Sequence, residues 1–137
     1  MKHFDMQFRV RYAETDAMGI VHHAVYPVWF EMGRTEYLRA VDIPYREMEA
    51  RSLQSPVIGL HVRYLKPARY DDLLTLTVKV AQYTGVRLTL HYEVFRDEEL
   101  LCTGESEHAF LSEGRATAVQ RKFMDIHEVL EKCEGEG

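Results

Sequence analysis

The 137-residue sequence has few cysteines and no excess of positive charge. Its two cysteines, Cys102 and Cys133, fit reduced thiols in a cytoplasmic protein better than a disulfide framework, and their spacing matches no zinc motif. The formal net charge of −5 argues against non-specific binding to nucleic acid or to anionic membranes. The N-terminal residues lack a signal-peptide hydrophobic region, and no apolar run approaches the ~18 residues of a membrane span. We therefore expect a soluble, cytoplasmic protein that binds no nucleic acid.

The sequence also lacks linkers, low-complexity runs and internal repeats. No Ser/Pro-rich stretch divides it, 46% of its residues are hydrophobic, and it contains eight Tyr, six Phe and one Trp. A chain of this length and composition can bury one core. We expect a single domain over residues 1–137, with residues 133–137 as a frayed tail.

Periodic apolar residues predict one long helix among several strands. Residues 4–12 alternate between apolar and polar, which is typical of a half-buried strand. Residues 25–41 instead carry two apolar stripes at helical spacing, so we expect this helix to be mostly surrounded. Gly33 in its middle costs roughly 1 kcal/mol relative to alanine, which indicates that a neighbouring element approaches closely. Pro44 precedes a predicted short helix over residues 45–51.

The second half of the chain reads as an antiparallel sheet. Alternating segments predict strands over residues 58–64, 74–80, 86–94 and 100–111, with a short pairing piece at 115–119 and a terminal helix at 125–132. Gly104 is interpreted as a bulge. One long helix followed by such a sheet is an α+β architecture. On the face of the sheet away from the helix we expect Thr75, Thr77 and Lys79 to meet solvent, and the regions near Gly59 and Gly104 to pair with another subunit.

The head of the long helix is the candidate site. Pro27 has no backbone N–H and suits only the first helical turn, so the helix should begin between His23 and Tyr26. The amides of His23 and Ala24 are then unpaired and suited to an anionic oxygen. Asp16 lies seven residues before His23, across a turn in which Gly19 lets the backbone bend back.

A carboxylate close to unpaired backbone amides suits attack on an acyl carbon. A carboxylate such as Asp16 acts as a nucleophile or as a general base on water, and an oxyanion donor contributes ~3–4 kcal/mol to lowering the barrier. A thioester fits because its leaving thiolate needs little protonation. The structural alternative is that Asp16 only caps the turn or the helix.

Neighbouring polar and aromatic residues have plainer roles. His22 and His23 are adjacent on a turn, where side chains are expected to point apart, and no third ligand follows, so we expect no metal. Glu31 is a candidate second acid, although an ion pair with Arg34 or a contact with Thr35 is the favoured interpretation. Three apolar residues of the helix are interpreted as core rather than as an acyl pocket: Trp29, Phe30 and Met32.

Two segments resemble one known family. Residues 12–26 read YAETDAMGIVHHAVY, and residues 63–72 read RYLKPARYDD. Both are similar to the hotdog-fold acyl-CoA thioesterases of the 4-hydroxybenzoyl-CoA thioesterase and YbgC type. The resemblance implies a hotdog fold, in which an antiparallel sheet of about five strands wraps round one helix. It also implies homo-oligomers, dimers or tetramers, with acyl-CoA sites at the subunit interface, and no cofactor besides the coenzyme A of the substrate.

The same resemblance implies roles for individual residues. Asp16 would be the catalytic acid, and the amide of His23 would polarise the thioester carbonyl. Substrate contacts are then expected from the surrounding residues Gly19, Val21, Val25 and Tyr26. In YbgC-like members an Asn follows two residues after the His; here that position is Val25, which bears on the acyl group preferred.

Basic residues are candidates for the phosphates of coenzyme A, for which the Arg fork and the Lys point charge are both suited. They are Arg63, Lys66, Arg69 and Arg87, and the alternative is that they are solvated strand ends and turns. The sequence thus predicts an acyl-CoA thioesterase. A non-catalytic acyl-CoA or acyl-carrier-protein binding module stays open, as does a hotdog hydratase that pairs Asp16 with His23.

Overall fold

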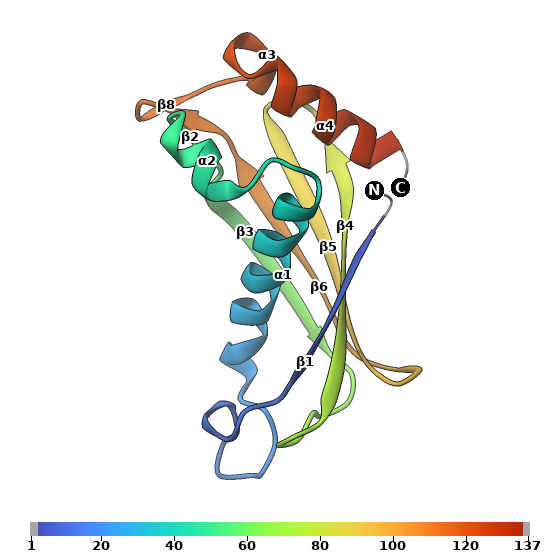
Figure 1. Cartoon of the computed structure of the whole chain (residues 1–137). Coiled ribbons are helices and arrows are strands. Elements are labelled where there is room, and N and C mark those ends of the chain that lie inside the picture. Colours follow the sequence, from blue (N-terminus) through green and yellow to red (C-terminus); the bar gives the residue numbers. More distant parts are fainter. Residues whose placement is uncertain (1–2, 136–137) are drawn as a thin grey trace.

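In the computed structural model, which describes residues 3–135, one long helix lies against one face of an antiparallel sheet (Figure 1). The helix is α1 (Tyr26–Ala40), and the five strands follow the order β1-β4-β5-β6-β3. The strands are β1 (Phe4–Arg9), β3 (Val57–Tyr64), β4 (Leu73–Tyr83), β5 (Arg87–Arg96) and β6 (Glu99–Ala109). The predicted α+β hotdog architecture, with one helix and five strands, is therefore confirmed.

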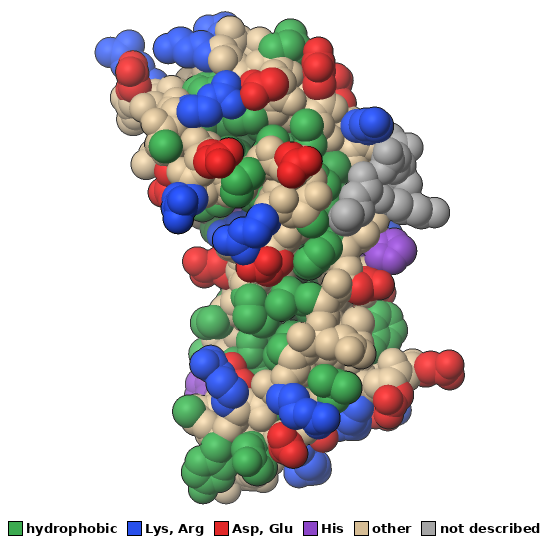
Figure 2. All heavy atoms as spheres, in the orientation of Figure 1, with side chains coloured by type: hydrophobic (Ala, Val, Ile, Leu, Met, Phe, Trp, Pro, Cys, Tyr) green, Lys and Arg blue, Asp and Glu red, His purple; other side chains and the backbone are tan. Residues whose placement is uncertain are grey.

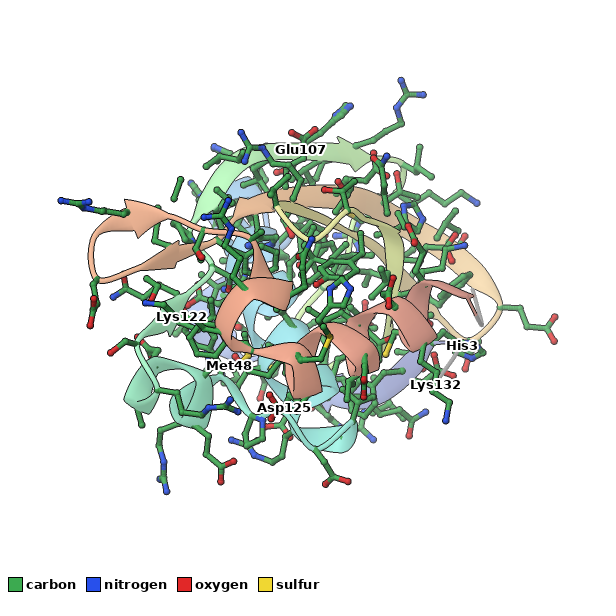
Figure 3. All side chains as sticks on the ribbon, turned by 90° about the horizontal axis from the view of Figure 1, so that it is seen from above. His3, Met48, Glu107, Lys122, Asp125 and Lys132 are labelled. Carbon is green, nitrogen blue, oxygen red and sulfur yellow. The ribbon has the colours of Figure 1, made fainter. Side chains whose placement is uncertain are left out.

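Short elements complete the fold. Two 3-10 turns, η1 (Tyr12–Glu14) and η2 (His23–Val25), precede α1. Helix α2 (Tyr45–Ala50) leads into a small sheet of β2 (Leu53–Gln54), β7 (Leu111–Ser112) and β8 (Arg115–Ala116). Viewed from above, α3 (Val119–Lys122) and α4 (Met124–Gly135) lie across one end of the sheet (Figure 3). Among residues 3–135 no helix has the length and apolarity to cross a bilayer.

Two predicted ends are wrong, each because of a specific hydrogen bond. β1 ends at Arg9 instead of Tyr12, since the Glu14 carboxylate accepts from the Arg11 amide at 2.7 Å and draws the chain into η1. Residues 133–135 do not fray: Cys133 is buried, and the Glu134 carboxylate accepts from the Tyr83 amide at 2.6 Å. The rest of the predicted tail, residues 136–137, lies outside the described residues.

Two glycines let α1 and the sheet approach closely. A Cβ on Gly33 would lie 2.5 Å from Leu76 Cδ2, so the predicted close approach at Gly33 is confirmed. Gly104 is not at a bulge, because it pairs in regular register with Val62 and Tyr92. Its missing side chain leaves room for the ring of Phe30, which stacks on Tyr92 at 4.4 Å. Gly104 lies in the inner strand β6 and Gly59 in the edge strand β3, and the expected pairing of these regions with another subunit stays a prediction.

A buried chain of hydrogen bonds runs between the sheet and the loop before β3. The Ser55 carbonyl can only accept, so His108 Nδ1 donates to it at 3.0 Å. His108 Nε2 therefore accepts from Ser106 Oγ at 2.7 Å, and Ser106 Oγ accepts from the Tyr92 hydroxyl at 2.6 Å. Burial lowers the pKa of His108 to about 4, which keeps the imidazole neutral at physiological pH.

This histidine makes the stability depend on pH. The unfolded chain has an ordinary His pKa near 6.5, above the folded value of about 4, so protonation favours unfolding. The contribution of the neutral ring is complete above pH ~6.5 and is lost as the pH falls to ~4, by about 3 kcal/mol. Urea unfolding at pH 7 and pH 4.5 should show this loss, and His108→Gln should reduce it. Equal pH dependence in His108→Gln and wild type would contradict the assignment.

Candidate active site

Asp16 sits in a tight loop that its own backbone and one carboxylate oxygen close. The Asp16 amide donates to the Ile20 carbonyl at 2.8 Å, and the Met18 amide donates to Asp16 Oδ1 at 2.8 Å. Gly19 has φ +79°, a conformation that favours glycine, as the predicted bend requires. Within residues 3–135 Asp16 Oδ2 has no hydrogen-bond partner. The carboxylate therefore caps the turn with one oxygen and leaves the other free.

Glu14 fixes this loop to the long helix. Its buried carboxylate accepts from Trp29 Nε1 in α1 at 2.9 Å and from the Arg11 amide, while its carbonyl accepts from the His22 amide at 2.9 Å. Burial by itself raises the pKa of Glu14, but the hydrogen bonds from Arg11 and Trp29 outweigh it and hold that pKa below its usual value. An ionised Glu14 thus joins both ends of the Asp16 loop to α1.

The helix start lies where Pro27 predicts it, with η2 leading into α1 at Tyr26. The prediction of two free amides is only half right. The Ala24 amide donates to His22 Nδ1 at 3.1 Å, whereas the His23 amide has no acceptor among the described residues. The rings of His22 and His23 do not point apart but stack at 4.3 Å. Residues 3–135 contain no cluster of three His, Cys, Asp or Glu side chains suited to a metal.

A cavity of about 310 Å³ lies between the Asp16 loop, the helix start and the end of β3. The two motif segments meet here, since the Val21 amide donates to the Ala68 carbonyl at 2.9 Å. Most of the lining is apolar or aromatic. The lining residues are Asp16, Met18, Ile20, Val21, His23, Tyr26, Tyr64, Leu65, Lys66 and Pro67.

Tyr64 holds the helix start against the sheet, a role that its place in the second motif did not reveal. Its hydroxyl donates to the His23 carbonyl at 2.7 Å, and its ring meets Tyr26 edge-on at 5.2 Å. Burial raises the pKa of Tyr26 to about 12, so its hydroxyl stays protonated at neutral pH. The cavity wall beside His23 is therefore aromatic and uncharged.

The structure brings together only part of the predicted set. Asp16, Val21, His23, Tyr26 and Lys66 line the cavity. Gly19 shapes the neighbouring turn, and Val25 packs against the core instead of lining the cavity. Trp29 and Phe30 are buried core residues, as predicted, and Met32 packs against that core. Glu31 is exposed, and the expected ion pair with Arg34 is not formed within residues 3–135.

The four basic candidates lie in different places. Lys66 is at the cavity, with its ammonium 2.8 Å from Glu99. The guanidinium of Arg69 has no partner within the described part of the chain. Arg63 lies on the opposite face of β3, in a depression with His61 and His91. Arg87 lies beside Arg121 and the start of α3, at the far end of the sheet from Asp16.

Comparison with known proteins gives the family. A model of the thioesterase-like superfamily matches residues 10–132. The chain belongs to this superfamily. YneP of Bacillus subtilis is 33% identical over 130 residues, which cover 93% of this chain and 94% of YneP. The acyl-CoA thioesterase YbgC of Haemophilus influenzae is 32% identical over 117 residues, or 85% of this chain and 86% of YbgC.

A solved structure agrees over nearly the whole chain. The DHNA-CoA thioesterase of Staphylococcus aureus superposes with a TM-score of 0.93 at 31% identity, covering 98% of this chain and 93% of that one. Together with YbgC, it confirms the family that residues 12–26 and 63–72 resemble.

Proposed function

We propose that the protein is an acyl-CoA thioesterase in which Asp16 and the His23 amide act on the same thioester carbonyl. The observation that carries the proposal is their arrangement: a free carboxylate oxygen and a free backbone N–H, on either side of a turn, belong to residues that line one largely apolar cavity. The names of YbgC and of the Staphylococcus aureus enzyme support the same substrate class.

In this mechanism the His23 N–H donates to the carbonyl oxygen as negative charge develops there. Asp16 Oδ2 either attacks the carbonyl carbon, giving an anhydride that water cleaves, or removes a proton from the attacking water. In both routes the C–S bond breaks, coenzyme A leaves as a thiolate, and the acyl group is released as the free acid. The apolar and aromatic lining houses the acyl chain and excludes other water.

Two alternatives use the same cavity. A hydratase normally pairs an Asp with a His for proton transfer, but no hydrogen bond joins Asp16 and His23 in the described residues. The His23 ring stacks on His22 instead, which favours hydrolysis. A binding module would hold acyl-CoA without turnover, and the free Asp16 oxygen would then have no chemical role.

Asp16→Asn separates these functions. Asn keeps an oxygen for the Met18 amide but loses the charge, so kcat/KM for acyl-CoA esters should fall by more than about 100-fold with little change in Tm. Thiol release over a panel of acyl-CoA esters measures this, with the exposed Asp42→Asn as control. Equal thiol release by Asp16→Asn and wild type would refute the role of Asp16. Binding without turnover in wild type would indicate a binding module, and an absorbance change of an enoyl-CoA without thiol release a hydratase.

We propose that the protein works as a homo-oligomer built on the β3 edge. β3 is eight residues long and lies at one side of the sheet, where an unpaired edge invites strand addition. Ile58, Leu60 and Tyr64 on this strand are each about half exposed, and Val28 on α1 is 57% exposed. Figure 2 shows hydrophobic side chains reaching the surface over the middle and the lower end of the molecule. A second copy of the chain would cover the exposed apolar side chains of β3 and of α1.

Such pairing bears on the coenzyme A phosphates. We assign them to Lys66, which lines the cavity, and to Arg69, which lies three residues further along the same connection. Arg63 lies one residue from Tyr64 on the outer face of β3. If two β3 strands pair antiparallel, the beginning of one lies beside the cavity end of the other. Arg87 pairs with Ala109, whose amide donates to the Pro56 carbonyl just before β3. Arg87 would thereby approach the partner's cavity, although it is far from its own.

Leu60→Lys tests the edge. A lysine at the centre of β3 should prevent the strands from pairing, so light scattering after size exclusion should show a monomer with reduced thioesterase activity. The control is Met124→Lys, an equally exposed apolar position at the start of α4, a helix that packs on β4. The proposal fails if wild type is a monomer or if Leu60→Lys keeps the wild-type mass.

We also place the enzyme in the cytoplasm, because both cysteines are free and buried.

A further inference from the structure

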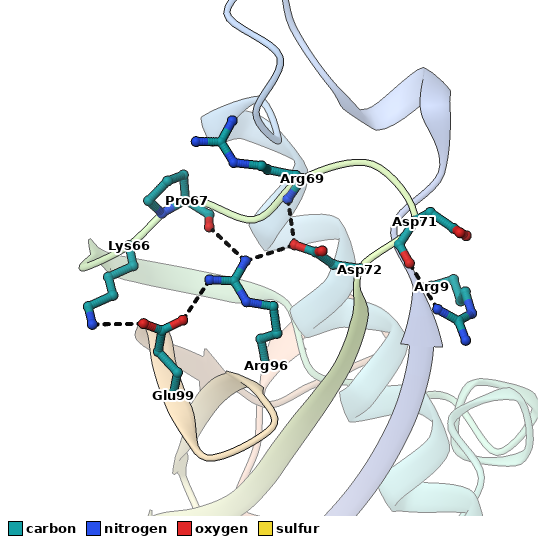
Figure 4. Close-up of polar contacts among 8 residues, drawn as sticks. All are labelled: Arg9, Lys66, Pro67, Arg69, Asp71, Asp72, Arg96 and Glu99. Carbon is teal, nitrogen blue, oxygen red and sulfur yellow. Dashed lines mark hydrogen bonds and ion pairs between the residues drawn. The ribbon is translucent and has the colours of Figure 1, made fainter.

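One carboxylate beside the cavity holds two cations. Glu99, at the start of β6, lies 2.8 Å from Lys66 Nζ through Oε2 and 2.6 Å from an Arg96 terminal nitrogen through Oε1 (Figure 4). Arg96 also reaches Asp72 at 2.8 Å and the Pro67 carbonyl at 3.3 Å. Through these contacts the β5–β6 hairpin binds the connection between β3 and β4 next to the candidate active site.

The ion pair between Lys66 and Glu99 occupies the ammonium group that a phosphate of coenzyme A would contact. Lys66 is the cation among the residues that line the cavity, and its ammonium faces Glu99. Hydrogen bonds from Lys66 and Arg96 hold the pKa of Glu99 below its usual value, so Glu99 is ionised at neutral pH. The Lys66 ammonium at the cavity is therefore paired with a carboxylate.

The same pairing is weak enough to exchange. The Lys66 side chain is 57% exposed and that of Glu99 is 37% exposed, and ion pairs at such positions contribute little and are screened by salt. A phosphate carries up to two negative charges and accepts from lysine as readily as a carboxylate does. Arg96 has Asp72 as a second partner, so Glu99 can release Lys66 while the hairpin stays attached.

We propose that Glu99 is a specificity-determining residue that competes with the phosphates of coenzyme A for the Lys66 ammonium. The inference rests on the proposed acyl-CoA function. The competition reduces the difference in KM between a coenzyme A ester and a thioester that has no phosphates. Product coenzyme A carries the same phosphates, so Glu99 also weakens product binding.

Glu99→Gln tests this with two substrates that carry the same acyl group, one on coenzyme A and one on pantetheine. Removing the competing charge should lower KM for the coenzyme A ester about threefold at low salt, and the effect should shrink at high salt. KM for the pantetheine ester should not change. Glu98→Gln is the matched control, because this exposed neighbour in the same hairpin changes the net charge equally without contacting Lys66.

Lys66→Met identifies the cause. It should raise KM for the coenzyme A ester only, and in its background Glu99→Gln should have no further effect. Glu99→Asp, whose carboxylate is withdrawn by one methylene, should give an intermediate KM and serves if Glu99→Gln is unstable. An unchanged or higher KM in Glu99→Gln, or an equal decrease in Glu98→Gln, would overturn the role of Glu99.

The Lys66→Met variant also tests whether Lys66 contacts coenzyme A at all, separately from the role of Glu99. If Lys66→Met leaves KM for the coenzyme A ester unchanged, Lys66 does not meet coenzyme A, and the role of Glu99 falls with that contact. If Lys66→Met raises KM but Glu99→Gln does not lower it, the contact stands and only the role of Glu99 is overturned. The thioesterase activity itself is read independently, from thiol release and its loss in Asp16→Asn.

Discussion

The buried carboxylate of Glu14 is the interaction on which the site depends. It accepts from the Trp29 indole in the long helix and from the Arg11 amide at the end of the first strand, and its carbonyl accepts from the His22 amide. These bonds satisfy a carboxylate that burial would otherwise make costly. They also fix the two ends of the Asp16 loop relative to α1. Without the Glu14 side chain, the Asp16 loop would lose its hydrogen bond to the Trp29 indole of α1.

The rest of the structure keeps that helix start in place. Gly33 and Gly104 remove the side chains that would hold α1 off the sheet, so Phe30 stacks directly on Tyr92. Just before the N-terminus of the helix, the Tyr64 hydroxyl donates to the His23 carbonyl and joins it to the edge strand. An amide that serves an oxyanion must be held before the reaction, because reorganisation during the reaction raises the barrier. In the proposed mechanism, the core packing thereby supports the oxyanion contact of the His23 amide.

The sequence predicted the parts that depend on periodicity and on backbone chemistry. Alternation located the strands, Pro27 located the helix start, and Gly33 indicated the close contact with the sheet. The prediction from sequence is wrong where a side chain takes the hydrogen bond of a backbone group or pairs with a charge. The His22 ring takes the Ala24 amide, Glu14 ends the first strand early, and Glu134 orders the last residues. Gly104 looked like a bulge because sequence does not show that Phe30 lies opposite it.

The same limit applies to charged residues far apart in the chain. Lys66 and Glu99 are 33 positions apart and meet only because the hairpin folds onto the β3–β4 connection. The chemistry of its side chain groups Arg87 with Lys66, but the topology places Arg87 beside the start of α3, away from the cavity. Such pairings follow from the order of the strands in the sheet, which the periodicity of each separate segment does not show.

The most direct test of the account is a crystal structure of the protein with a non-hydrolysable acyl-CoA analogue in which the thioester sulfur is replaced by a methylene group. The account predicts that the analogue's carbonyl oxygen accepts from the His23 amide at about 3 Å and that Asp16 Oδ2 faces the carbonyl carbon. A carbonyl bound away from the His23 amide, or an Asp16 carboxylate turned wholly into its own loop, would contradict it.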